Sequence, residues 1–143
     1  MNKKLILKVK KLHEEAILPN MVYKNDSGFD VFSVENVNFF FSTVKKIKIG
    51  LAFELPPNTE LQVRPKSGLA SQGFACILGT VDEGYRGEVE IICHYFGNKD
   101  FKVSKGQKIA QLVLMPVLRP KIEVVENLNE SERGIKGFGS TGA

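Results

Sequence analysis

Apolar residues recur at every second position through much of this chain. The longest run alternates from residue 47 to residue 55 as Ile47, Ile49, Leu51, Phe53 and Leu55. Shorter pairs repeat the pattern: Leu61 with Val63, Val89 with Ile91, Phe101 with Val103, and Ile122 with Val124. A period of two is that of a strand with one buried face. Most of the chain is therefore predicted to be extended.

Turn residues separate these runs, as in Asp26-Ser27-Gly28, Pro56-Pro57-Asn58, Gly97-Asn98 and Lys105-Gly106. Only residues 67–72 have the pattern of a helix. Roughly ten short strands with regular turns are typical of a β-sandwich or jelly roll. The 143 residues, 43% of them hydrophobic, can bury about two-thirds of the unfolded surface in one core. We predict a single all-β domain with one short helix.

The net charge and the two cysteines limit the kinds of partner and the cellular compartment that we expect. The formal net charge of +4 suits a polyphosphate substrate, but the lysines are scattered, so we expect most of them on a solvated surface and neither nucleic acid nor a membrane as a partner. Lysines also interrupt the apolar N-terminal residues, which argues against a secretory signal. Cys76 and Cys93 lie in apolar runs without CxxC spacing, which predicts buried free thiols in the cytoplasm.

Three glycine-containing segments carry the chemistry. Residues 79–87, GTVDEGYRG, predict a strand, a tight turn and a strand, with Asp82 and Tyr85 at the tip of a hairpin that a ligand can approach closely. The alternative is an ordinary hairpin in which Asp82 caps its own backbone. Residues 64–71, RPKSGLAS, predict a helical turn whose first amides bind an anion, or a plain N-cap at Ser67.

The third segment is the C-terminal stretch 133–142, RGIKGFGSTG, which is too rich in glycine to build a core. Its last six residues match GxGxxG, but no helix and strand can follow, so a dinucleotide fold is excluded. Such tails are usually disordered. Its successive backbone amides, two hydroxyls and Arg133 are nevertheless suited to a polyphosphate, and Phe138 to a base, which favours a mobile lid.

Five strings in order resemble the motifs of the homotrimeric dUTPase family: SGFDVFS from Ser27, RPKSGLAS from Arg64, GTVDEGYRGEV from Gly79, KGQKIAQLVLMPV from Lys105 and RGIKGFGSTG from Arg133. The resemblance implies jelly-roll subunits that form a trimer, with residues 1–132 as the core and residues 133–143 as a flexible arm exchanged between subunits. It implies hydrolysis of dUTP to dUMP and pyrophosphate, which limits uracil in DNA and supplies dUMP for thymidylate synthesis.

The resemblance also implies roles for individual residues. Three are catalytic: Asp82 as the base, Tyr85 under the deoxyribose to exclude a 2′-hydroxyl, and Gln111 orienting the α-phosphate and water. The remaining substrate contacts are Gly79, Thr80 and Val81 at uracil, Lys66, Ser67 and Gly68 at the phosphates, and Arg133, Phe138, Gly139, Ser140 and Thr141 in the arm. Mg²⁺ is expected chiefly on the phosphates and water. Asp30 would contact it through water.

Some alternatives stay open beside this assignment. Gln111 adjoins an apolar run and could be a buried structural glutamine, and Asp30 could stabilise a turn. Arg86 and Glu88 are expected to pair around the hairpin or at the trimer interface. The chain has Lys66 where the family usually has arginine, which replaces a bidentate fork by a point charge.

Two further departures concern the arm and the base. Lys136 stands where glycine is common in the family. The segment between Ser67 and Asp82 is shorter than in many bacterial members and has no asparagine for uracil, so base recognition should fall on the main chain. The rival functions are dCTP deamination and a non-catalytic module of the same fold.

Overall fold

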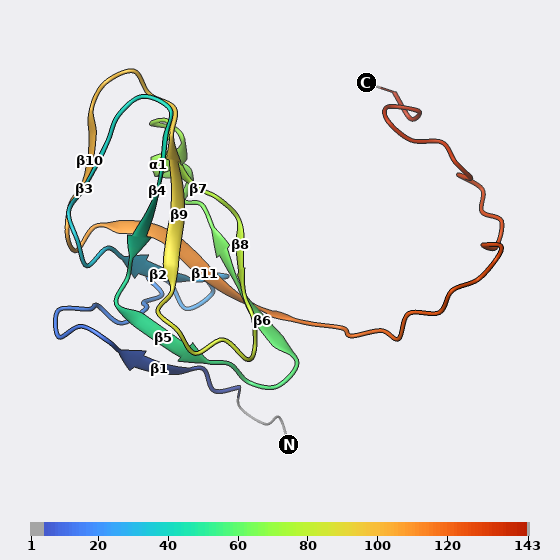
Figure 1. Ribbon diagram of the computed structural model, residues 1–143, viewed down its shortest axis with the longest axis horizontal. Coiled ribbons are helices and arrows are strands. Elements are labelled where there is room, and N and C mark those ends of the chain that lie inside the picture. The colour runs from blue at the N-terminus through green and yellow to red at the C-terminus, as the bar shows by residue number, and fades with distance from the viewer. Residues whose placement is uncertain (1–4, 143) are drawn as a thin grey trace.

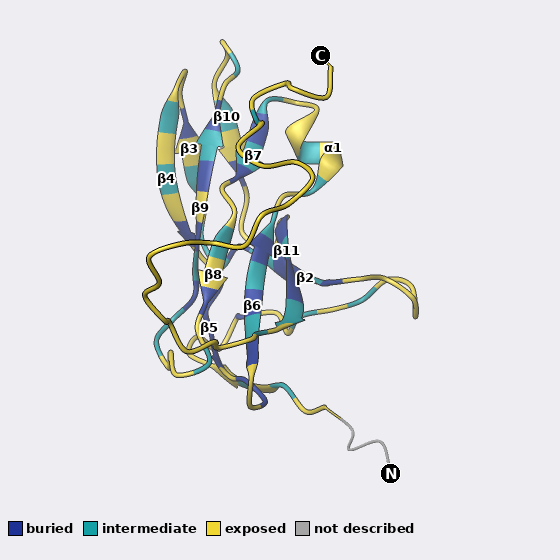
Figure 2. Ribbon diagram, turned by 90° about the vertical axis from the view of Figure 1, so that its right-hand side faces the viewer, coloured by how far each residue is buried: buried dark blue, intermediate teal, exposed yellow. Residues whose placement is uncertain are grey.

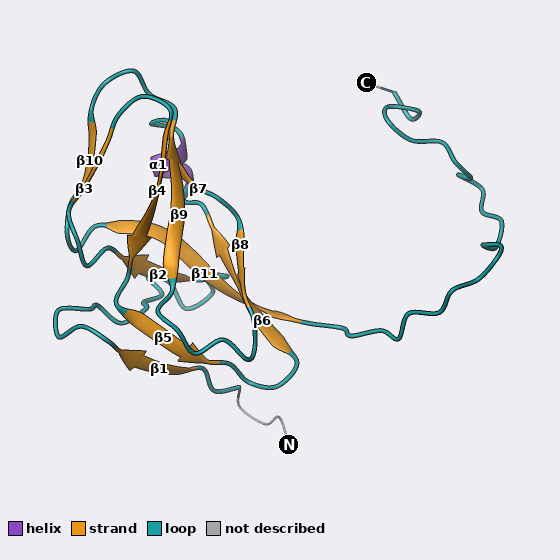
Figure 3. Ribbon diagram, viewed as in Figure 1, coloured by secondary structure: helices purple, strands orange, loops and turns teal. Residues whose placement is uncertain are grey.

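The structure is a computed structural model that describes residues 5–142; the ends of the predicted core and arm, residues 1–4 and 143, lie outside the described residues. The prediction of an all-β fold with one short helix is confirmed (Figures 1 and 3). The elements are β1 Lys8–Lys11, β2 Phe29–Phe32, β3 Val37–Phe39, β4 Thr43–Lys48, β5 Leu51–Glu54, β6 Thr59–Arg64, α1 Ser67–Ala70, β7 Phe74–Cys76, β8 Gly79–Val81, β9 Glu90–Tyr95, β10 Phe101–Val103 and β11 Lys108–Pro116.

The described strands form two main sheets and two smaller pairs, and every pairing is antiparallel. One main sheet has the order β2-β11-β6-β8 and the other the order β4-β9-β7, while β1 pairs with β5 and β10 with β3. The long strand β11 lies between β2 and β6 and pairs with both, with a register shift between Lys108 and Ala110 on the β2 side. This position makes β11 the centre of the sheet that carries most of the candidate site.

The core is filled by the inward faces of both main sheets. Leu61 and Leu112 of the larger sheet and Ile91 of the smaller one are fully buried in a single hydrophobic cluster. Aromatic rings of β3, β7 and β10 pack together: Phe74 lies edge-on against Phe39 at 5.1 Å and is stacked with Phe101 at 4.9 Å between ring centroids. Aromatic pairs of this kind add to simple area burial. The body is thus a β-sandwich with one core.

The alternating run 47–55 is buried as expected but is not one strand. All five of its apolar residues are buried, yet β4 ends at Lys48, and β5 begins at Leu51 and pairs with β1 instead of β9. Gly50 makes the break, because it has φ +69° and a Cβ there would lie 2.9 Å from side-chain atoms of Ala16 and Val34. The alternation over residues 47–55 thus predicted correctly which side chains are buried, but the prediction of one continuous strand is wrong.

The predicted hairpin across residues 79–87 is wrong in its pairing. β8 pairs with β6 in the larger sheet, whereas β9 pairs with β4 and β7 in the smaller one. The turn after Val81 therefore carries the chain from one sheet to the other. The apolar run before it is also split, because β7 ends at Cys76 while Ile77 and Leu78 are exposed. A crossing between sheets has the same local signature as a hairpin.

The C-terminal segment 117–142 leaves the body and is exposed at nearly every residue (Figures 1 and 2). The strand expected from Ile122 and Val124 is absent from this described segment, and their side chains are 87% and 95% exposed. Among the described residues, neither of them pairs with a strand of the body. We call the whole segment 117–142 the arm from here on. The predicted boundary at residue 132, which would make only residues 133–143 the flexible part, stays a prediction about the assembled protein.

Both cysteines are free and buried, as predicted. They face each other across β7 and β9, where Cys76 is the register partner of Cys93. Burial raises the pKa of Cys76 to about 11 and that of Cys93 to about 12, so both remain thiols at neutral pH. Within residues 5–142, no helix has the length and apolar character needed to cross a membrane.

Candidate functional site

A row of polar side chains crosses the larger sheet. In register, Gln111 of β11 lies between Asp30 of β2 and Arg64 of β6. Directly opposed residues of antiparallel strands point to the same face, so these three side chains share the face opposite the buried Leu112 and Val63. They line a cavity of about 490 Å³ together with Val22, Tyr23, Asp26, Ser27, Gly28, Lys66, Lys108 and Val113. We call this cavity the cationic cavity.

Asp30 holds two lysines at its floor. Its Oδ1 accepts a hydrogen bond from the Lys66 ammonium and its Oδ2 forms an ion pair with Lys108 at 3.0 Å. Burial alone would raise the pKa of Asp30, but the hydrogen bonds from Lys66 and Lys108 and their charges outweigh it, so the pKa is lowered. Asp30 is therefore ionised and fixes both ammonium groups. This contact is more specific than the turn-stabilising role left open for Asp30.

Gln111 lies in this cavity and is only half-buried, which disagrees with the alternative of a fully buried structural glutamine. Its Nε2 donates to the main-chain oxygen of Pro65 at 3.2 Å. The glycine at position 28 makes room for it, because a Cβ there would lie 2.9 Å from the Leu112 oxygen and 3.1 Å from Gln111 Oε1. The amide is thus tied to the segment that precedes α1.

The short helix α1 begins beside the same cavity. Its N-cap residue is Lys66, without a side-chain capping bond, so the alternative of an N-cap at Ser67 is wrong. Ser67 and Gly68 occupy the first helical positions, where main-chain N–H groups have no intrahelical acceptor. A Cβ at Gly68 would meet no atom within 4 Å, so a ligand could approach this backbone closely.

The second group of predicted residues lines a different cavity, of about 270 Å³, which we call the Asp82 cavity. Its lining includes Thr80, Val81, Asp82 and Tyr85. The Asp82 main-chain oxygen accepts from Tyr85 N at 3.0 Å, but the carboxylate has no hydrogen bond to any described residue, so the alternative in which it caps its own backbone fails. The carboxylate is exposed and available to a substrate or water.

Tyr85 folds back over its own loop. Its hydroxyl donates to the Glu88 main-chain oxygen at 3.0 Å, and a Cβ at Gly87 would lie only 2.5 Å from that hydroxyl. Gly87 is therefore required by the tyrosine itself. The Glu88 side chain contacts His13 outside the loop, with 2.8 Å between its Oε1 and the His13 Nε2. Gly79 is less constrained, since a Cβ there would make only ordinary contact with Val63 at 3.7 Å.

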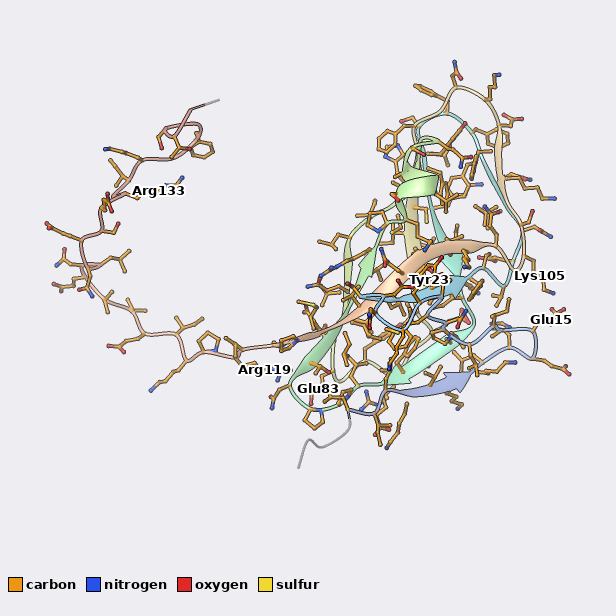
Figure 4. The ribbon with its side chains drawn as sticks, turned by 180° about the vertical axis from the view of Figure 1, so that it is seen from behind. Glu15, Tyr23, Glu83, Lys105, Arg119 and Arg133 are labelled. Carbon is orange, nitrogen blue, oxygen red and sulfur yellow. The ribbon has the colours of Figure 1, made fainter. Side chains whose placement is uncertain are left out.

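The structure brings Asp30 together with residues of the RPKSGLAS and KGQKIAQLVLMPV motifs. The Asp82 loop and the C-terminal motif lie elsewhere in the single chain. No residue lines both the cationic cavity and the Asp82 cavity. Arg133 lies far out on the arm (Figure 4), where its Nε donates to the Lys136 oxygen at 2.8 Å. Phe138 is fully exposed, and Gly139, Ser140 and Thr141 follow in turns at the end of the described chain. One chain thus presents three separate groups.

Two cationic residues of the cationic cavity were not predicted from the sequence. Lys108 and Arg64 stand within the fourth and second motifs, but no role was assigned to either. Their signal was positional: Lys108 begins β11 three residues before Gln111, and Arg64 is the register partner of Gln111. With Lys66 they give the cavity three cationic side chains against the carboxylates of Asp26 and Asp30. Such a lining favours an anion such as a phosphate chain.

Comparison with known proteins agrees with this arrangement. The sequence model of the dUTPase family matches residues 14–142. The chain is 51% identical to a deoxyuridine 5′-triphosphate nucleotidohydrolase of Clostridioides difficile, over 95% of this chain and 97% of that protein, and 49% identical to one of Crocosphaera subtropica, over 95% and 98%.

A solved structure extends the comparison to three dimensions. The dUTPase of Staphylococcus bacteriophage 80alpha, solved with dUPNHPP, is similar with a TM-score of 0.88 at 30% identity, and the match covers 96% of this chain and 99% of that one. The five motifs, both main sheets and the residues of the cationic cavity all lie within residues 14–142, which the family model matches. The chain belongs to the dUTPase family.

Proposed function

We propose that this protein is a dUTP diphosphatase, which hydrolyses dUTP to dUMP and pyrophosphate by attack of water on the α-phosphate. The observation that carries the proposal is the cationic cavity, where Lys66, Lys108 and Arg64 face a space large enough for a phosphate chain, in a member of this family. The related phage enzyme was solved with dUPNHPP, a substrate-like ligand. In a cell the reaction would limit uracil in DNA and supply dUMP, and we place it in the cytoplasm.

The chemistry divides between the two cavities. Asp82 acts as the general base, since its carboxylate is free of internal hydrogen bonds, and Tyr85 supports the deoxyribose. The main chain of Gly79, Thr80 and Val81 recognises uracil. On the other side, Gln111 orients the α-phosphate and the attacking water, while the phosphates rest against Lys66, Ser67 and Gly68.

We infer that a homotrimer assembles the site. Within one chain the two cavities share no lining residue, and we propose that a substrate that touches both Asp82 and Gln111 lies between subunits. The arm of a further subunit then supplies Arg133, Ser140 and Thr141 to the γ-phosphate, with Gly139 close to the backbone and Phe138 over uracil. The exposed Ile122 and Val124 would pair with a neighbouring subunit when the arm is exchanged.

Mg²⁺ fits this scheme as a companion of the substrate. The described residues contain no cluster of three or more metal-ligating side chains, which suits an ion held mainly by phosphates and water. Both oxygens of Asp30 already bind lysines, yet each can accept a second hydrogen bond. Asp30 can therefore orient a metal-bound water without coordinating the ion. Bound Mg²⁺ would neutralise the developing charge on the phosphates.

One assay separates the candidate reactions. Purified protein is incubated with Mg²⁺ and either dUTP or dCTP, and pyrophosphate and ammonia are measured in parallel. We expect pyrophosphate from dUTP and no ammonia from dCTP. Ammonia release would instead assign a deaminase, and the absence of both products would indicate a non-catalytic module. Mixing Asp82→Asn subunits with subunits lacking residues 133–143 should restore activity if sites are shared, and failure at every mixing ratio would refute sharing.

A further inference from the structure

Three residues from distant parts of the chain meet where the arm leaves the body. The Arg119 guanidinium donates through Nη2 to Glu83 Oε2 at 2.7 Å and through Nη1 to Asn58 Oδ1 at 2.9 Å. The main-chain N–H of Asn58 donates to the same Glu83 oxygen at 3.0 Å. Figure 4 shows Arg119 and Glu83 side by side at the root of the arm. We call Asn58, Glu83 and Arg119 the arm-root cluster.

Asn58 is built into the centre of the cluster. Its backbone has φ +59°, a conformation that asparagine tolerates better than most residues. Its N–H binds Glu83, its side-chain oxygen accepts from Arg119, and its main-chain oxygen accepts from Val117 N at 2.9 Å. Asn58 thus ties the turn between β5 and β6 to both the loop after β8 and the first residues beyond β11.

The cluster acts on the loop that carries the proposed base. Glu83 directly follows Asp82, and its main-chain oxygen accepts a second tether, from Arg86 Nη1 at 2.7 Å. The same Arg86 nitrogen also donates to the Tyr85 oxygen at 3.2 Å. The loop from Asp82 to Tyr85 is therefore restrained in two ways. The Glu83 side chain binds Asn58 and Arg119, and the main-chain oxygens of Glu83 and Tyr85 bind Arg86.

The energetics indicate what these contacts achieve. Exposed ion pairs contribute little to folding, because water screens the charges, and the Arg119 and Glu83 side chains are 53% and 33% exposed. The cluster is therefore a weak source of global stability. Arg119, however, contacts two partners in a fixed fork geometry, which restrains direction more than a single point charge can. Loss of the arm-root cluster should therefore change the orientation of the Asp82 loop more than the stability of the fold.

We propose that Asn58, Glu83 and Arg119 are positioning residues that fix the Asp82 loop by fastening it to the root of the arm. The inference rests on the proposed dUTP hydrolysis. None of these three residues lines either cavity, but Glu83 directly follows Asp82, which does. The first residues beyond β11 thus restrain the Asp82 loop, and this role does not depend on the position of residues 133–143.

The test measures kcat and KM for dUTP in Arg119→Ala, Glu83→Ala and the double variant. We expect kcat to fall on the order of tenfold with KM within about twofold, because a small displacement of the base affects the chemical step. The double variant should lose no more than either single one, since both remove the same tether. Arg119→Lys should recover only part of kcat, as it can bind Glu83 or Asn58 but not both in the same fork.

Controls separate positioning from folding. Lys121→Ala removes a nearby cation of the arm, and Lys8→Ala breaks an exposed ion pair of the same 2.7 Å length to Glu54; both should keep kcat within about twofold. Melting temperature and sedimentation should match the wild type in every variant. Hydrogen exchange of residues 83–88 should be faster in Arg119→Ala than in Lys121→Ala.

Contrary outcomes are equally clear. Unchanged kcat in Arg119→Ala, a loss confined to KM, additive losses in the double variant, or unchanged hydrogen exchange would each overturn the positioning role. If Arg119→Ala fails to fold, the same readouts on Arg119→Lys and Asn58→Gly decide, since glycine keeps the left-handed backbone and removes only the side-chain acceptor. A wild-type protein without activity on dUTP would refute the proposed function itself, whereas hydrogen exchange would still test the tether.

Discussion

The same sequence pattern has opposite fates in β6 and in the arm. Leu61 and Val63 alternate with polar residues and are buried, whereas Ile122 and Val124 alternate in the same way and are almost fully exposed. The difference lies in the surroundings, because β6 has β11 and β8 on its two sides, while Ile122 and Val124 pair with no strand of the described chain. Alternation alone therefore does not show that a segment is buried, because burial also requires neighbouring strands.

Removal of the arm is the strongest test of this contrast. Deleting residues 133–143 should bring dUTP turnover close to background, because Arg133 and the glycine-rich turns are lost from the proposed site. Thermal stability should change little, since the deleted segment has no buried side chain among its described residues. Turnover assays with calorimetry give both quantities. A fully active truncated protein would show that the arm is not a lid.

Replacing the proposed base should affect chemistry alone. Asp82→Asn is expected to slow turnover by about 10² to 10⁴ while leaving dUTP binding and the proposed trimer intact, since the carboxylate makes no internal hydrogen bond to any described residue. Single-turnover kinetics and calorimetric titration measure the two effects. Asp100→Asn, at an exposed carboxylate just before β10, is the matched control. Normal turnover by Asp82→Asn would remove Asp82 from the mechanism.

A pair of truncations compares the body and the arm directly. Leu61→Ala should cost about 2–5 kcal/mol of unfolding free energy, because Leu61 is fully buried. Ile122→Ala should cost less and should weaken subunit association, visible as earlier dissociation on dilution in sedimentation experiments. If Ile122→Ala changes neither stability nor association, the arm is not paired with a neighbouring subunit at that position.

The smallest expected effect concerns Asp30. Its pKa in the folded protein lies below the ordinary value of 3.8, so the ionised carboxylate favours folding above that pH. This contribution is lost as the pH falls through the lowered pKa. Urea unfolding should therefore show wild type more stable than Asp30→Asn at neutral pH, with the gap narrowing in acid. A gap that stays constant down to pH values of about 2 would contradict the ion pairs with Lys66 and Lys108.

The sequence predicted the fold class and the buried faces, because both depend on local alternation. It missed the break at Gly50, where packing against Ala16 and Val34 decides the turn. It also predicted a hairpin where the chain crosses between sheets, since the pairing of β8 with β6 depends on contacts distant in sequence. Local pattern determines which side chains are buried, and long-range pairing determines which strands are neighbours.

Prediction of the candidate site was limited in the same way, because contacts between distant residues could not be predicted. Asp82, Tyr85 and Gln111 stand in recognisable motifs, so their importance could be predicted, but their division between two cavities could not. The arm-root cluster was missed altogether. Its members lie 25 and 36 residues apart in the chain and belong to no common motif, so only the folded structure reveals the contact of Glu83 with Asn58 and Arg119.

The buried thiol pair has a practical consequence. Cys76 and Cys93 are the only two cysteines of the chain, and neither is accessible or ionised at neutral pH. Maleimide dyes and spin labels should leave the native protein unmodified. A single cysteine introduced at the exposed Ser131 would then be the one reactive position, giving a spectroscopic reporter of arm motion without any change to the core.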